Sequence, residues 1–99
     1  MKAEMFNKQA WVKTTDASFL KHTFDEFLTS SGFEILDYQQ KKFKPFGFTG
    51  LWLLGESHFA IHTFPEHNKA YIELSSCVKE PFDNFEVKIK PFIGEFGVK

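Results

Sequence analysis

The stretch "SHFAIHTFPEHNKAYIELSSC", residues 57–77, predicts a β-hairpin around which the rest of the chain can be arranged. Both arms are rich in β-branched and aromatic residues, and the four residues "PEHN" between them are typical of a turn. If Phe64 pairs with Lys69, Ser57 lies opposite Ser76, and Cys77 is one place away. A change of one residue in the length of the turn would put Cys77 directly opposite Ser57. Opposed residues have Cβ atoms about 4.5–5.5 Å apart. Ser57 and Cys77 can therefore share one site.

His62 cannot easily join that site. It follows Ser57 by five positions, and at about 3.3 Å per residue the two lie roughly 16 Å apart on the opposite faces of a regular strand. A site that uses both residues needs a sharply bent strand or a second subunit. We favour a symmetric homodimer, in which each site takes Ser57 and Cys77 from one chain and His62 from its mate.

Two helices are expected outside the hairpin. Asp16 can cap the first, which ends at Gly32, and an apolar stripe at helical spacing marks its buried side: Leu20, Phe24, Phe27 and Leu28. The spacing of Phe82, Phe85 and Ile89 predicts a second, short helix that stops at Pro91, although residues 85–89 would also suit a strand.

Three further strands are expected, at residues 10–14, 33–43 and 51–56. Pro45, Gly47 and Gly50 predict a loop over residues 44–50. The run "LWLLGE", residues 51–56, is continuously apolar at its start, which is typical of a strand buried on both faces.

Size and composition exclude several classes of protein. Ninety-nine residues suit a single domain, and 12 basic against 13 acidic side chains argue against nucleic-acid binding. No apolar run approaches the roughly 18–20 residues that span a membrane, and the start lacks the apolar segment of a signal peptide. A lone cysteine fits a reducing, cytoplasmic setting. We expect no metal, because His58, His62 and His67 would be spread along the hairpin.

The segment "GFTGLWLLGESHFAIHTFPE", residues 47–66, followed by a cysteine twenty places after Ser57, resembles the prokaryotic S-adenosylmethionine decarboxylase proenzymes. The resemblance extends more loosely over the region from Ala10 to Pro81. It implies an α+β fold: a small two-layer sandwich, with an antiparallel sheet and two helices on one face. It also implies a single domain over residues 1–99 and active sites at the interface of a homodimer.

The resemblance further implies a zymogen that cleaves itself between Glu56 and Ser57. Residues 1–56 would become the β chain and residues 57–99 the α chain, with a pyruvoyl group generated from Ser57 at the new N-terminus. That group would form a Schiff base with S-adenosylmethionine and serve as electron acceptor for its decarboxylation, which supplies spermidine biosynthesis.

Other roles follow from the resemblance residue by residue. His62 would assist cleavage and lie in the active site, and Thr49 would assist the acyl shift. Cys77 would donate a proton to the substrate after decarboxylation. Phe43 would stack with His62 around the adenine, and Glu66 would bind the ribose hydroxyls.

The sequence departs from the family pattern after Glu66. It reads "HNKAYIELSS" where the family has a Gly-Tyr pair, and Val78 follows Cys77 where glycine is usual. The end, "PFIGEFGVK", does not clearly supply a closing strand. Two alternatives therefore stay open: the same pyruvoyl chemistry on arginine or ornithine, and an uncleaved, non-catalytic regulatory homologue.

Overall fold

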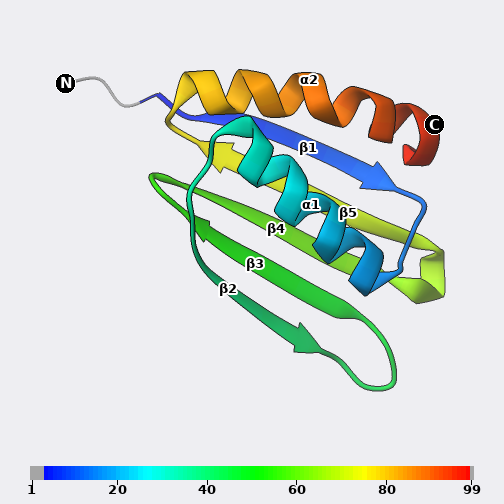
Figure 1. The fold of residues 1–99 in the computed structure, drawn as a ribbon. Coiled ribbons are helices and arrows are strands. Elements are labelled where there is room, and N and C mark those ends of the chain that lie inside the picture. The colour runs from blue at the N-terminus through cyan, green and yellow to red at the C-terminus, as the bar shows by residue number, and fades with distance from the viewer. Residues whose placement is uncertain (1–3, 99) are drawn as a thin grey trace.

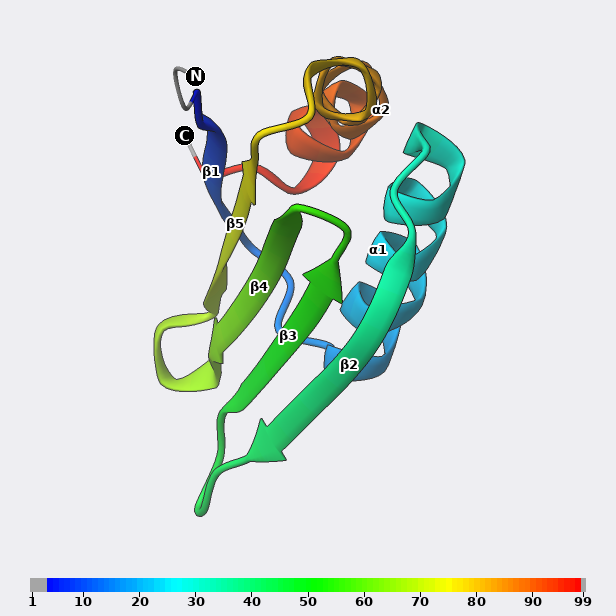
Figure 2. The ribbon, with the colours of Figure 1, turned by 90° about the vertical axis from the view of Figure 1, so that its left-hand side faces the viewer.

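The computed structural model describes residues 4–98 as a two-layer α+β sandwich (Figure 1). The strands are β1 (Phe6–Val12), β2 (Ile35–Lys42), β3 (Phe48–Leu54), β4 (Ser57–Phe64) and β5 (Lys69–Ser76). The helices are α1 (Ala17–Ser31) and α2 (Lys79–Phe96), and a 3-10 turn spans Pro65–His67. The sheet is antiparallel throughout, in the order β1-β5-β4-β3-β2, and both helices cover the same face of it (Figure 2). The predicted fold class is confirmed.

The predicted hairpin and its register are also confirmed. Strands β4 and β5 pair from Phe64 with Lys69 to Ser57 with Ser76, without a shift. The turn closes at Asn68, whose φ of 54° lies in the left-handed region that asparagine tolerates better than most residues. Burial alternates along β4, so that Ser57 lies on the helix-covered face of the sheet and His62 on the uncovered face.

Helix α1 begins and ends where the sequence indicates. The side chain of Asp16 accepts a hydrogen bond from the backbone N–H of Phe19 (3.1 Å), which satisfies one of the free donors of the first turn. Gly32 ends the helix with a φ of 108°. The stripe between them is buried at Leu20, Phe24 and Leu28.

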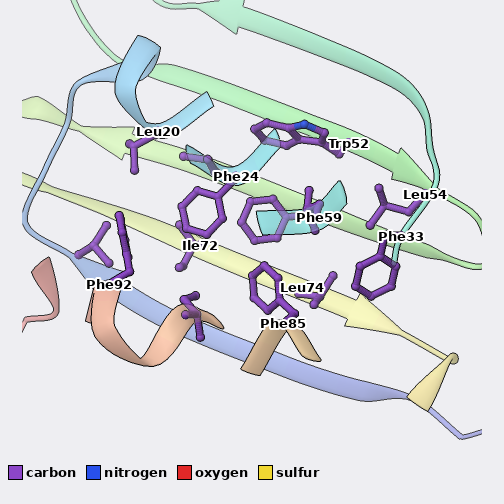
Figure 3. Close-up of a cluster of buried hydrophobic side chains, with 14 of the residues drawn as sticks. Leu20, Phe24, Phe33, Trp52, Leu54, Phe59, Ile72, Leu74, Phe85 and Phe92 are labelled. Atoms are coloured by element: carbon purple, nitrogen blue, oxygen red, sulfur yellow. The ribbon is translucent and has the colours of Figure 1, made fainter. Parts of the chain in front are cut away.

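The core lies between the helices and one face of the sheet (Figure 3). Phe24 is at its centre, with ring centroids 4.7 Å from Phe59 of β4, 6.2 Å from Phe85 and 5.3 Å from Phe92 of α2. Side chains along β3, β4 and β5 alternate between this core and the uncovered face. This alternation fixes which candidate site residues face the helices and which face outward.

The strand predictions need three corrections. β1 spans Phe6–Val12 instead of residues 10–14, because it pairs as an edge strand with residues 70–76 of β5. The loop predicted over residues 44–50 ends before Phe48, since residues 48–50 already pair with β4. The 51–56 segment is not buried on both faces: Leu51 and Leu53 are 46% and 53% exposed on the uncovered side.

The prediction that the second helix stops at Pro91 is wrong. Helix α2 continues to Phe96, because its apolar face goes on past the proline: Phe92 and Phe96 pack against Phe19 of α1, with centroids 6.3 and 5.4 Å away. After the helix, Gly97 forms an isolated bridge to Val12 in place of a closing strand.

Candidate active site

Strand β4 begins directly after a two-residue turn made of Gly55 and Glu56. Glu56 has a φ of 57°, a conformation that is uncommon for a residue with a side chain and that costs on the order of 1–3 kcal/mol. The strained residue is the one whose carbonyl belongs to the predicted cleavage bond.

Ser57 follows this turn and is only 8% exposed. Its hydroxyl donates a hydrogen bond to the hydroxyl of Ser76, directly opposite on β5, at 2.7 Å. The serine side chain is thus withdrawn from solvent and held by a single partner at the end of the sheet.

Cys77 contacts the carbonyl oxygen of the peptide bond between Glu56 and Ser57. Its backbone N–H donates to the Glu56 carbonyl oxygen at 3.4 Å, and its thiol lies 3.1 Å from the same oxygen. The thiol is exposed and is also 3.9 Å from a carboxylate oxygen of Glu56. Two donors aimed at one carbonyl oxygen form the kind of arrangement that stabilises negative charge when a nucleophile attacks the carbon.

His62 and Thr49 form a second group. They are opposed on β4 and β3, and the Thr49 hydroxyl lies 2.9 Å from Nδ1 of His62. β4 pairs with both neighbouring strands at each position from Ser57 to Thr63, so no sharp bend brings His62 back to Ser57. Within one chain the two groups remain roughly 16 Å apart, at about 3.3 Å per residue.

Phe43 and Glu66 lie at the end of the sheet that is remote from Ser57. Phe43 follows β2 in the loop to β3, is 49% exposed, and lines a cavity of about 260 Å³ together with Thr63 and Pro65. Glu66 is exposed in the 3-10 turn after β4. The structure therefore divides the candidate residues between two ends: Glu56, Ser57 and Cys77 at one, and Thr49, His62, Phe43 and Glu66 toward the other.

Tyr71 is a neighbour of His62 that the sequence reasoning did not single out. It is opposed to His62 across β4 and β5, and its hydroxyl donates to Glu73 at 2.9 Å. Burial, and then the hydrogen bond and the charge of Glu73, raise the pKa of the Tyr71 phenol. The strand register would have indicated this residue.

Residues 4–94 match the sequence profile of the S-adenosylmethionine decarboxylase family. The chain belongs to that family. The S-adenosylmethionine decarboxylase proenzyme of Geobacillus kaustophilus is 42% identical over 65 residues, which are 66% of this chain and 52% of the relative. That of Oceanobacillus iheyensis is 32% identical over 89 residues, 85% of this chain and 71% of the relative.

The chain thus spans about half the length of the first of these S-adenosylmethionine decarboxylase proenzymes. The crystal structure of the adenosylmethionine decarboxylase from Aquifex aeolicus matches with a TM-score of 0.66 at 21% identity, covering 89% of this chain and 82% of that one. At this level of identity the likeness supports the fold alone.

Residues 4–98 contain neither a membrane-spanning helix nor a cluster of metal-ligating side chains. No helix there is long and apolar enough to cross a membrane. No three histidine, cysteine or acidic side chains in the same range are grouped closely enough to hold a metal ion.

Proposed function

We propose that this chain is the proenzyme of a pyruvoyl-dependent S-adenosylmethionine decarboxylase, which cleaves itself between Glu56 and Ser57 into chains 1–56 and 57–99. One observation carries the proposal: in a member of this family, the Glu56 carbonyl is held by Cys77 beside the buried hydroxyl of Ser57. We place the protein in the cytoplasm, where an exposed lone thiol stays reduced.

The cleavage is an acyl shift followed by an elimination. The Ser57 oxygen attacks the Glu56 carbonyl carbon, the C–N bond breaks, and the proton of the hydroxyl ends on the released nitrogen, which leaves an ester. Removal of the Ser57 α-proton then expels Glu56 as a carboxylate and leaves dehydroalanine. Tautomerisation and addition of water release ammonia and leave the pyruvoyl group. The strain at Glu56 and the two donors of Cys77 favour the first step.

The residues around Ser57 fit such a group. The position is the first residue of β4, so a chain that starts there keeps its strand pairing, and the Cys77 thiol lies beside it. The pyruvoyl group supplies a ketone that reacts with the substrate amine and a carbonyl that accepts electrons as carbon dioxide leaves. Cys77 would then return a proton to the substrate α-carbon. His62, oriented through its bond to Thr49, would assist the cleavage and line the site.

The second group of residues supports a nucleoside substrate. An exposed aromatic ring, Phe43, and an exposed carboxylate, Glu66, lie near the end of β4 that follows His62. A ring offers a stacking surface for adenine, and a carboxylate accepts hydrogen bonds from ribose hydroxyls. An amino acid such as arginine or ornithine carries no base that could stack on Phe43, so the exposed ring is the residue that favours a nucleoside.

In this proposal, two chains are needed to bring the residues at the two ends of the sheet into one active site. In the proposed homodimer each site takes Ser57 and Cys77 from one chain and Phe43, His62 and Glu66 from its mate. The regular pairing of β4 supports this, and so does the uncovered sheet face, which exposes Leu51 and Leu53.

Complementation tests the composite site. A cleaved Cys77→Ala chain mixed with a cleaved Glu66→Ala chain should recover roughly a quarter of wild-type activity, because half the dimers would carry one intact site of two. No recovery despite proven subunit exchange would place the whole site within one chain.

Carbon dioxide release tests the function, with S-adenosylmethionine, ornithine and arginine assayed side by side on the same protein. We expect turnover of S-adenosylmethionine, and a KM raised by about 5- to 150-fold in Phe43→Ala, since stacking contributes about 1–3 kcal/mol. Val87→Ala, which alters an exposed apolar side chain of helix α2, is the control. If only ornithine or arginine is turned over, the proposed substrate is wrong. If a cleaved protein turns over none of the three compounds, the proposed decarboxylase activity is wrong.

A further inference from the structure

We infer that Ser76 is a positioning residue for self-cleavage: it holds the Ser57 hydroxyl ready to attack the Glu56 carbonyl. This inference rests on the proposed cleavage and concerns a residue that was expected only to pair with Ser57 across the hairpin. Ser76 is fully buried, with 0% of its surface exposed, and is opposed to Ser57 across β4 and β5.

The hydrogen-bond capacity of Ser76 fixes the direction of its bond to Ser57. A serine hydroxyl has one proton and accepts two hydrogen bonds. The Ser76 oxygen accepts from the backbone N–H of Val78 at 3.0 Å, and its proton is directed at the Val78 carbonyl at 3.3 Å. The 2.7 Å contact to Ser57 is then one in which Ser57 donates. The Ser57 proton therefore points at Ser76, and the lone pairs of its oxygen are left free.

Two adjacent residues, Ser76 at the end of β5 and Cys77 just after it, thus hold the two groups that react in the proposed cleavage: the Ser57 hydroxyl and the Glu56 carbonyl. Ser76 fixes the nucleophile, and Cys77 holds the carbonyl oxygen through its N–H and thiol. The Val78 backbone anchors Ser76 in turn, at the start of helix α2. Holding two reactants in place lowers a barrier because the orientation no longer has to be found, and a misplacement of about 1 Å can slow a reaction about 100-fold.

Ser76 acts by orientation and not as the final proton acceptor. The Ser76 hydroxyl donates its own hydrogen bond to the Val78 carbonyl, which is too weak a base to remove that proton, so Ser76 cannot pass a proton on. The proton released from Ser57 ends on the Ser57 nitrogen when the C–N bond breaks. A hydroxyl of the same shape should therefore be sufficient, and an apolar group of the same shape should not.

The test compares self-cleavage rates of full-length chains made by cell-free synthesis and followed by mass spectrometry. Ser76→Thr and Ser76→Val are matched in shape and differ in the hydroxyl. We expect Ser76→Thr to cleave within about threefold of wild type, and both Ser76→Val and Ser76→Ala to be about 10- to 100-fold slower. Ser75→Ala is the control, since Ser75 is also buried on β5 but bonds Asn7 instead, and its rate should be unchanged.

Circular dichroism of each variant separates orientation from folding, and rates are compared at a temperature where all are folded. If Ser76→Ala does not fold, the Thr and Val pair decides. Folded Thr and Val variants that cleave equally fast, or a Ser76→Ala variant as fast as wild type, would overturn this inference alone. A folded wild-type chain that never cleaves would overturn the proposed function and this inference together.

Discussion

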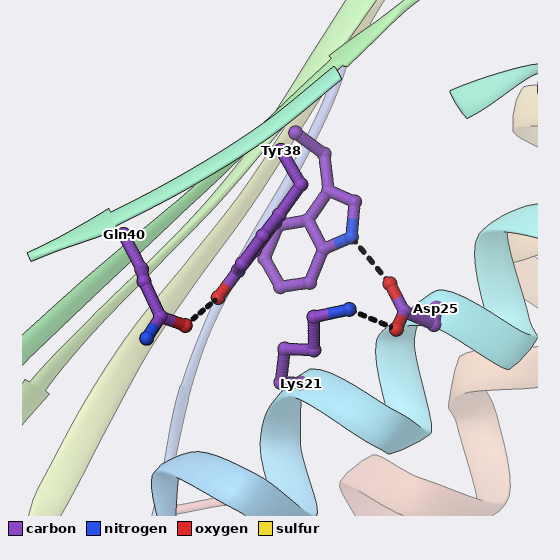
Figure 4. A network of polar contacts seen from close by, with 5 residues as sticks. Lys21, Asp25, Tyr38 and Gln40 are labelled. Carbon is purple, nitrogen blue, oxygen red and sulfur yellow. Dashed lines mark hydrogen bonds and ion pairs between the residues drawn. The ribbon is translucent and has the colours of Figure 1, made fainter. Parts of the chain in front are cut away.

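At the scale of single residues, Asp25 is the clearest link between helix α1 and the sheet (Figure 4). One of its carboxylate oxygens accepts from the indole N–H of Trp52 at 2.7 Å, and the other accepts from Lys21 at 2.5 Å. Tyr38 lies against the same group, with Lys21 4.6 Å from its ring centroid, and burial, then the charge of Asp25, raise the Tyr38 pKa. The Asp25 carboxylate therefore satisfies a donor on a fully buried side chain of the core.

The two contacts of Asp25, with Trp52 and with Lys21, should contribute unequally to the stability of the fold. Asp25→Ala leaves the Trp52 N–H without its partner, and we expect the free energy of unfolding to fall by about 1–3 kcal/mol. Lys21→Ala removes a partly exposed ion pair, which contributes about 0.2–1 kcal/mol, and a cation–π contact with Tyr38, which contributes about 0.5–1 kcal/mol, but it leaves no buried donor without a partner. Denaturant titration followed by tryptophan fluorescence measures both. Asp25→Asn, which keeps an acceptor, should recover most of the loss; equal losses for Asp25→Ala and Lys21→Ala would contradict this view of the contact.

At the scale of elements, helix α2 contains Pro91 in its interior. The proline cannot donate a hydrogen bond to Val87, and its ring crowds the preceding turn. The helix persists because Phe92 is buried against Phe24, and Phe92 and Phe96 also pack on Phe19. Tertiary packing here overrides a local signal to stop.

Removal of this proline should therefore stabilise the protein. Pro91→Ala restores a helical donor, and after allowance for the greater freedom of the unfolded chain we expect a gain of about 1–3 kcal/mol in the free energy of unfolding. Pro81→Ala is the matched control, because Pro81 lies in the first turn of α2, where an N–H has no helical partner. A loss of stability in Pro91→Ala, measured by urea titration, would show that the helix needs the proline.

The elements also show what the sequence could and could not predict. The β4–β5 hairpin and α1 were predictable because turn and cap residues mark them locally, and that register placed Ser57 opposite Ser76. The extent of α2 was not, since it depends on packing against Phe19, distant in sequence. The contact of the Cys77 N–H and thiol with the Glu56 carbonyl oxygen escaped prediction, because it depends on the left-handed backbone of Glu56.

At the scale of the whole molecule, strand β4 separates two groups of candidate site residues. The sheet presents Glu56, Ser57 and Cys77 at one end, and it places His62 on the uncovered face toward the other. In the proposed function, a single chain prepares the bond that is cleaved, whereas the substrate site takes residues from two chains. Whether the bond between Glu56 and Ser57 is cleaved can be examined without knowledge of the substrate.

Intact-mass analysis of the purified, folded protein tests for this cleavage. We predict two chains that divide between Glu56 and Ser57, with the smaller, C-terminal chain carrying a pyruvoyl group whose mass shifts on borohydride reduction. Ser57→Ala should remain a single chain, because no hydroxyl is left to attack the Glu56 carbonyl. A wild-type protein that is folded by circular dichroism and keeps one full-length mass after prolonged incubation would contradict the account and favour an uncleaved regulatory homologue.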